Sequence, residues 1–333
     1  MSRPRLQRAL LASVGVLVVA VAATSLRAAP SPAPPTERHA SQRTISVQVD
    51  LVSVSARDVL YDESFRVGEG GELRLNLGSE SVTVRTVQGD RARVIVEGDG
   101  RDAASEFARR RFSARAEGRD LVVRTDPPRR RWSSGRTDAR FEVTVEIPRR
   151  YSADLDIGSG SVRVASLQGD LRVDTGSGSV QVDDVDGRVV SLDTGSGSVR
   201  AQSLRGDVHI DTGSGSVSVD RVDGSLAVDT GSGSVTVGEV DGPVTVDTGS
   251  GGVQMTLRSA ASAAVDTGSG SVTLRLPRGR GFDVDVEGGS VQIDDALDFS
   301  GHRDRDEARG RLAGGGPTLR VGTGSGTIRL VTS

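Results

Sequence analysis

The sequence has no cysteine and no lysine, and aromatic residues form only 3% of its 333 positions. Without cysteine the chain can form no disulfide and no zinc–thiolate site, and it has no thiol nucleophile. A globular core of this size normally contains more large side chains, whereas a slender solenoid can be filled by Val, Leu and Ile. The 43 glycines follow no Gly-X-Y period, which excludes collagen.

All 42 basic residues are arginine, and the net charge of −3 hides an uneven distribution. Residues 101–151 carry an excess of arginine, whereas residues 152–300 carry a larger excess of Asp and Glu. This asymmetry suggests the hypothesis that the basic segment docks on the acidic part of its own chain or of a neighbouring copy. Salt would weaken such an association.

A pentapeptide, Gly-Ser-Gly-Ser-Val, returns every 18 or 19 residues in the second half of the chain. It begins at Gly158, Gly176, Gly195, Gly213, Gly231 and Gly268, with the variant Gly-Ser-Gly-Gly-Val at Gly249. A fixed period of this length predicts a stacked repeat architecture. Each unit has too few aliphatic residues to be stable alone, so coils must stack at a spacing of ~4.8 Å. The glycines are expected to supply the positive φ angles of tight corners.

We therefore predict an all-β fold, a β-solenoid that is similar to a single-stranded β-helix and is built from 18–19-residue repeats. Residues 1–29 are expected to be a signal peptide or signal-anchor, and residues 30–43 a Pro-rich linker. Residues 44–148 form an N-terminal β-rich region with one short helix, either a cap or the first coils. Residues 149–333 form the β-solenoid repeat domain.

The first 29 residues have the layout of a secretory signal. Arg3, Arg5 and Arg8 precede an uncharged stretch, residues 9–26. That stretch is close to the ~18-residue lower limit for a membrane-spanning helix, so the segment is either cleaved or kept as an anchor. Because the arginines stay in the cytoplasm, the rest of the chain is exported in both cases. We expect a location in the periplasm, at the cell surface or outside the cell, with an inner-membrane anchor if the segment is retained.

Alternating patterns predict strands, and one segment predicts a helix. The expected strands cover residues 44–55, 72–77, 81–87, 91–96, 112–116, 120–125 and 140–147. The expected helix covers residues 102–112, with Asp102 as its cap. Polar loops are expected at residues 126–138 and 298–317, and residues 319–331 are expected to close the open edge of the stack.

Six of the repeat corners are preceded by Asp-Thr. The aspartates are Asp174, Asp193, Asp211, Asp229, Asp247 and Asp266. Asp-Thr-Gly-Ser resembles the motif of pepsin-like aspartic proteases, but those enzymes need two copies in separate lobes, whereas each copy here is a repeat corner. Stacked carboxylates would repel unless each accepts backbone amide bonds in an Asx-turn or the column binds a cation. Calcium-binding solenoid repeats have a nine-residue period, so we prefer the turn interpretation and keep the cation ladder as the alternative.

Three further groups of polar residues are candidates for a site. One consists of aspartates that could seat calcium or carbohydrate, although a solvated coil edge is the simpler interpretation: Asp183, Asp184, Asp186, Asp220, Asp223 and Asp241. The three histidines, His39, His209 and His302, lack metal-ligand spacing. The third group could hold anionic glycans or lipid head groups, although a solvated loop is simpler: Arg109, Arg110, Arg111, Arg129, Arg130, Arg131 and Trp132.

Several features together resemble a known family. They are the alternating strands with Gly-Ser-Gly-Ser-Val corners, the helix at residues 102–112, and the strand that ends in Ile147-Pro148. They resemble the bacterial putative-adhesin family, a β-strand-repeat domain of unknown function, over roughly residues 70–333. The resemblance implies an exported β-solenoid at the cell surface, and it supplies no catalytic residues.

The leading functional hypothesis is an exported, non-enzymatic β-solenoid that acts as an adhesin or envelope structural protein. We expect no catalytic residues and no cofactor, and partners among surface glycans, envelope components or further copies of the chain. An exported, net acidic chain is not expected to bind nucleic acid, and membrane contact is expected only through an uncleaved N-terminal segment. The alternatives are a membrane-anchored extracytoplasmic sensor or envelope-stress accessory protein, and a carbohydrate-active β-helix enzyme.

Overall fold

The computed structural model describes residues 57–126, 139–259 and 261–333. The expected signal segment, the Pro-rich linker and the strand at residues 44–55 lie outside the described residues. The same holds for His39 and for the arginine-rich loop that contains Trp132. Within the described part of the chain, no helix is long and apolar enough to cross a membrane.

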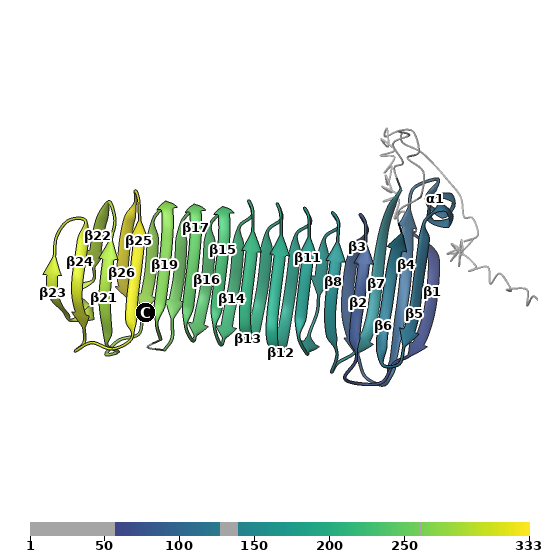
Figure 1. Cartoon of the computed structure of the whole chain (residues 1–333), viewed down its shortest axis with the longest axis horizontal. Helices are drawn as coiled ribbons and strands as arrows, with labels where there is room; N and C mark the ends of the chain where they lie inside the picture. The colour runs from purple at the N-terminus through teal and green to yellow at the C-terminus, as the bar shows by residue number, and fades with distance from the viewer. Residues whose placement is uncertain (1–56, 127–138, 260) are drawn as a thin grey trace, which may run out of the picture. The chain divides into compact units, whose positions relative to one another are not determined.

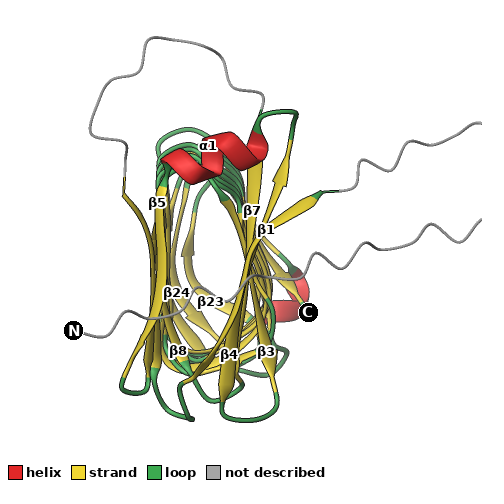
Figure 2. Cartoon of the chain, turned by 90° about the vertical axis from the view of Figure 1, so that its right-hand side faces the viewer, coloured by secondary structure: helices red, strands yellow, loops and turns green. Residues whose placement is uncertain are grey.

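Two sheets face each other along a stack of coils, so the predicted β-solenoid is confirmed (Figures 1 and 2). Each regular coil contributes one strand to each sheet, and the Gly-Ser-Gly-Ser corner connects the two strands. Strands of successive regular coils pair in parallel and in register, as Val173 does with Leu192 and Val180 with Val199. We call the sheet that contains Val173 face A and the sheet that contains Val180 face B.

The strands of face A follow one another along the stack in the order β5 (Arg111–Glu117), β6 (Asp120–Asp126), β2 (Glu72–Leu77), β8 (Ser152–Ile157), β11 (Leu171–Thr175), the second half of β12 (Val180–Thr194), the second half of β13 (Val199–Thr212), β15 (Leu226–Ser232), β17 (Val244–Ser250), β19 (Ala263–Ser269), β25 (Thr318–Thr323), β21 (Phe282–Glu287), β24 (Glu307–Leu312) and β23 (Phe299–Arg303).

Those of face B follow in the order β1 (Asp58–Arg66), β4 (Arg91–Asp99), β7 (Arg140–Pro148), β3 (Ser81–Val87), β9 (Val162–Val164), the first halves of β12 and β13, β14 (Val217–Asp223), β16 (Val235–Asp241), β18 (Val253–Leu257), β20 (Val272–Leu276), β26 (Thr327–Thr332) and β22 (Ser290–Ile293). The short strand β10 (Leu167–Gln168) follows β9 and pairs with β12.

The core between the two faces consists of stacked aliphatic side chains. Alternate residues of each strand point inward, so that Val173, Leu192 and Val208 are fully buried. Each of these side chains lies in a column, where the same position of the neighbouring coil supplies another aliphatic residue. Because each face contributes only a single layer of inward side chains to this core, aliphatic residues fill it and few aromatic residues are needed.

A ladder of buried threonines holds the Gly-Ser-Gly-Ser corners. The Thr212 hydroxyl accepts a hydrogen bond from the Gly215 amide at 3.0 Å and donates one to the Gly197 carbonyl of the preceding coil at 3.1 Å. Thr175 and Thr194 make the same pair of bonds. The expected Asx-turns are wrong at these corners, because the amide two residues after each aspartate, such as that of Gly176 after Asp174, donates to main-chain carbonyls of the preceding coil. The threonine hydroxyl accepts the bond from the second glycine of the corner.

Main-chain crowding, rather than positive φ, explains the second glycine of the corner. A Cβ atom on Gly178 would lie 1.9 Å from the carbonyl oxygen of Gly160 in the neighbouring coil. Gly178 has no positive φ. The expectation of positive φ holds instead at the opposite corner, where Gly206 and Gly224 have φ of 120° and 139°.

The predicted helix is confirmed as α1 (Ala103–Arg109), which is shorter than expected. Asp102 is at the N-cap position, but its side chain makes no capping hydrogen bond. Phe107 packs against Phe112 and Phe141, with ring centroids 5.4 and 6.0 Å apart. In Figure 2, α1 lies over the corners at one side of the stack.

The order of strands at the C-terminal end differs from the prediction. Residues 319–331, expected to close the stack, form β25 and β26, which lie between β19–β20 and β21–β22. The expected polar loop at residues 298–317 instead contains the hairpin β23–β24, whose strands pair antiparallel at the edge. Only Ala308 and Leu312 of this hairpin are buried, so its sequence shows little of the alternation that predicts a strand.

Candidate functional site

A column of aspartates is the most regular feature of the outer surface of face A. Successive coils place these carboxylates directly opposite one another on paired strands, and all are exposed. The column comprises the predicted Asp174, Asp193, Asp211, Asp229, Asp247 and Asp266. Asp156, which sequence reasoning missed, extends it by one coil and accepts a hydrogen bond from the Asn76 side chain at 2.8 Å.

Burial and the stacking of like charges raise the pKa of one member of this column, Asp193. Burial raises the pKa of Asp193, and the neighbouring carboxylates of Asp174 and Asp211 raise it further. Within the described residues, no arginine is in ion-pair distance of the six predicted aspartates. The column is therefore a line of same-sign charge without ion pairs, and the charge of Arg172 offsets it only in part at Asp193.

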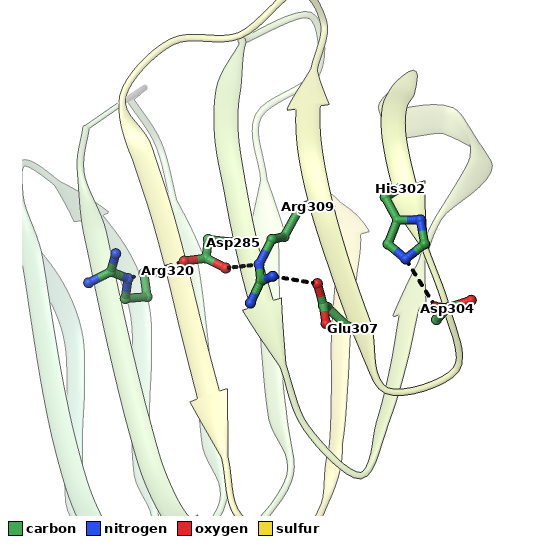
Figure 3. Close-up of polar contacts among 6 residues, drawn as sticks. All are labelled: Asp285, His302, Asp304, Glu307, Arg309 and Arg320. Carbon is green, nitrogen blue, oxygen red and sulfur yellow. Dashed lines mark hydrogen bonds and ion pairs between the residues drawn. The ribbon is translucent and has the colours of Figure 1, made fainter.

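The next column on face A is neutral in its middle and charged at its ends. Its middle positions are Ser191, His209, Ala227, Thr245 and Ala264. At the C-terminal end, Asp285 accepts hydrogen bonds or ion pairs from Arg309 at 3.1 Å and from Arg320 at 3.5 Å (Figure 3). His302 pairs with Asp304 at 3.0 Å. Charges on this column thus have ion-pair partners at the C-terminal end of the stack.

At the opposite edge of the solenoid, charged side chains of neighbouring coils form ion pairs. Arg205 lies between Asp186 and Asp223 of the coils on either side, at 3.1 and 3.3 Å. Glu239 similarly lies between Arg221 and Arg258, at 3.5 and 3.2 Å. Opposite charges meet across these coils, although Asp223 is also directly paired with Asp241. Two of the six aspartates that were candidates for calcium or carbohydrate binding, Asp186 and Asp223, are thus held in ion pairs.

No group of three or more His, Asp or Glu side chains is placed to hold a metal ion within residues 57–126, 139–259 and 261–333. The cation ladder on the aspartate column therefore stays a prediction. His209 stands alone in the neutral column, and His302 contacts only an aspartate among the side chains near it.

Three surface grooves run between the side-chain columns, with volumes of about 240 to 290 Å³. One of the larger ones lies on face A around Asp170 and Arg188. Asp170 accepts hydrogen bonds from the amides of Arg188 and Val189 at 2.8 and 3.0 Å. Desolvation raises the pKa of Asp170, but these amides and the Arg188 guanidinium outweigh it and lower the pKa overall. This carboxylate therefore closes a corner and is not free for acid–base chemistry.

A buried ion pair closes the corner nearest to α1. Glu80 stands where later corners have their second glycine, and its carboxylate accepts hydrogen bonds from the amides of Gly78 and Ser79, both at 2.8 Å. The same carboxylate pairs with Arg110, whose guanidinium lies 4.4 Å above the ring of Phe141. Sequence reasoning missed this pair and assigned Arg110 to a basic surface patch.

The expected basic patch combines Arg109, Arg110 and Arg111 with an arginine-rich loop that lies outside the described residues, so it stays a prediction. Arg110 points into the corner, whereas Arg109 pairs with Glu106 at 3.7 Å. The described part of the chain also contains no ion pair between an arginine of residues 101–151 and an acidic residue of residues 152–300. The hypothesis that the basic segment docks on its own solenoid gains no support from these contacts.

These features define an all-β solenoid with in-register columns of outward polar side chains. The chain belongs to the Toastrack DUF4097 family, which matches residues 72–331. The expected membership of a bacterial β-strand-repeat family of unknown function is confirmed. The comparison with curated proteins finds no match.

Solved structures with low sequence identity align with most of the chain. A putative adhesin from Bacteroides fragilis is 11% identical over 83% of this chain and 99% of its own, with a TM-score of 0.37. A putative adhesin from Parabacteroides distasonis is 13% identical over 83% and 98%, also with a TM-score of 0.37. A putative lipid binding protein from the same species is 12% identical over 81% and 96%, with a TM-score of 0.34.

Proposed function

We propose that this protein is an exported, non-enzymatic β-solenoid that acts as an adhesin or as a structural protein of the cell envelope. The observation that supports this most directly is the parallel pairing of equivalent core positions in every coil from β8–β9 to β19–β20, with register shifts only at Asp186/Val189 and Val237/Val240. Such a stack places equivalent side chains at ~4.8 Å intervals along a stiff scaffold. A surface of this kind suits multivalent contact with another repetitive surface, such as a glycan or envelope polymer.

The arrangement of the acidic residues favours binding over catalysis. A glycosidase needs two carboxyl groups ~5–10 Å apart in unlike environments, one of them protonated at working pH. The aspartates of face A instead share one environment, repeated in every coil. The groove carboxylate Asp170 is held by two amides and an arginine. Neither arrangement provides one carboxyl group that would stay protonated as the acid beside a second that would be ionised as the base.

The test is a binding and turnover experiment on the full exported chain. The purified protein is incubated with isolated envelope material and with immobilised glycans, and retention and release of sugar products are both measured. We expect saturable retention on at least one surface without product release. Retention on none of them would contradict the adhesive role, and release of sugars would point to the enzyme.

A membrane-anchored extracytoplasmic sensor is the second candidate, and the uncharged stretch at residues 9–26 favours it. Mass spectrometry of the mature N-terminus separates the two. A chain that begins near residues 23–30 has lost the anchor and cannot be such a sensor, whereas an intact first segment in the membrane fraction would support one.

A further inference from the structure

The last coil of the chain lies inside the stack. We call β25 and β26, residues 318–332, the inserted coil. It pairs in parallel with β19 and β20 on one side and with β21 and β22 on the other. Both neighbours precede it in the sequence, so the inserted coil enters a slot whose two walls are formed by earlier residues (Figure 1).

The contacts in this slot are the general contacts of the repeat. Leu319, Ile328 and Leu330 are fully buried in the same aliphatic columns that run through the other coils. The Thr323 hydroxyl donates to the Gly270 carbonyl at 3.0 Å, as Thr212 and Thr267 do to the coil before them. Main-chain pairing and aliphatic packing recognise a coil of this sequence, and the same coil from a second copy of the chain offers identical groups.

The inserted coil is joined to the preceding hairpin by a short, strained hinge, residues 313–317. Ala313 has φ of 46°, and it is one of two non-glycine residues with positive φ in the described part of the chain. Gly314 and Gly315 follow with φ of 88° and 94°. The Gly315 amide donates to the Leu312 carbonyl at 2.9 Å, which closes the turn. A non-glycine residue in this region is strained, and opening the hinge releases that strain.

We propose that the inserted coil exchanges between two copies of the chain, so that each copy fills the slot of the other. The closed chain and the exchanged dimer contain the same contacts in the slot and differ at the hinge, which is the condition for domain swapping. Short hinges under strain favour the exchanged form. The partner is a second copy of this chain, and the proposal requires no surface ligand, so it is independent of the proposed adhesive function.

Cysteine cross-linking tests the exchange without interference from native thiols, because the chain has no cysteine. Ala264 and Arg320 are directly paired outward residues of β19 and β25. Full-length A264C and R320C chains are unfolded together, refolded as a mixture and oxidised. We expect a disulfide between A264C and R320C chains, since exchange brings the inserted coil of one chain beside β19 of the other.

A matched control uses a pair of residues that the exchange leaves in one chain. Thr245 and Ala264 are paired in the same way on β17 and β19. A mixture of T245C and A264C chains should give no more than the cross-linking of random collisions. If the A264C–R320C mixture gives no more heterodimer than this control, the proposal is wrong.

Two hinge substitutions should change the yield in opposite directions. A313G removes the strained alanine and should lower the A264C–R320C yield several-fold. G315A should raise it several-fold, because its Cβ would need a positive φ and would lie 2.7 Å from Asp283 Oδ1 in the closed hinge. Circular dichroism confirms that each variant folds. Equal yields, or changes of the same sign, would overturn the assignment of residues 313–317 as the hinge and the exchange with it.

Discussion

Replacing a ladder threonine by valine should destabilise the solenoid only where the hydroxyl has partners. In T212V the buried Gly215 amide and Gly197 carbonyl each lose a hydrogen bond, at 3.0 and 3.1 Å. Leaving one buried polar group unpaired costs ~1–3 kcal/mol, and the two groups share one hydroxyl. Valine keeps the shape of the side chain, so little packing is lost. We expect a loss of about 2 kcal/mol.

The repeat itself provides the control. Thr230 occupies the same position and is equally buried, but its hydroxyl has no hydrogen-bond partner in the structure. T230V removes an unpaired buried hydroxyl and should be neutral or slightly stabilising. Urea unfolding followed by far-UV circular dichroism, with amide exchange at Gly215, measures both variants. Equal losses for T212V and T230V would refute the role of the hydroxyl and leave only the volume of the residue.

Three further predictions concern charge and close approach. Because the folded state raises the pKa of Asp193, this carboxylate contributes a loss of stability as the pH rises from about 4 through its folded pKa, below about 1 kcal/mol at an exposed site. The stability of the wild type should therefore fall relative to that of D193N over this pH range. A pH series of urea midpoints that is identical in both proteins would contradict this. E80A leaves the Arg110 charge without its buried partner and should cost about 3 kcal/mol in the same assay, whereas E80Q, which still accepts the amide bonds, should lose less. G178A should cost about 2 kcal/mol or more, because its Cβ meets a carbonyl at 1.9 Å, while G252A, with no atom nearer than 3.6 Å, should change the midpoint little.

The sequence predicts the fold well because one physical signal is repeated many times. Each unit alternates aliphatic residues on both sides of the same corner, and the period sets which residues stack. The core positions Val180, Val182 and Val185 are buried as the alternation requires. The order in which the coils stack is harder to predict from the sequence, because every coil with this pattern offers similar aliphatic and main-chain groups to its neighbours. The position of β25 between β19 and β21 depends on which neighbours compete for it.

The candidate site could be predicted only in part, for reasons that particular residues show. Leu171, Val173 and Thr175 have the same parity, which places the threonine inside and Asp174 outside, yet the Asp-Thr-Gly-Ser motif draws attention to the carboxylate. Alignment of Asp156 with the later corners would have revealed the first member of the column. No local pattern predicts the Glu80–Arg110 pair, since the contact links residues 30 positions apart.

The edge near Arg205 and the aspartate column of face A differ in how they handle the repulsion between stacked like charges. In-register stacking places like positions together, so a repeated charge meets its own copy unless the sequence varies. At the edge near Arg205 the sequence does vary, and the arginine separates Asp186 from Asp223. Along the aspartate column it does not vary over seven coils, although a single arginine per pair of coils would offset the repulsion. The scaffold tolerates this repulsion because threonine hydrogen bonds, main-chain ladders and the aliphatic core hold the coils from within. The stability of the stack therefore does not constrain which residues occupy the outward columns. Stacking alone does not explain why aspartate is kept at the same outward position in successive coils.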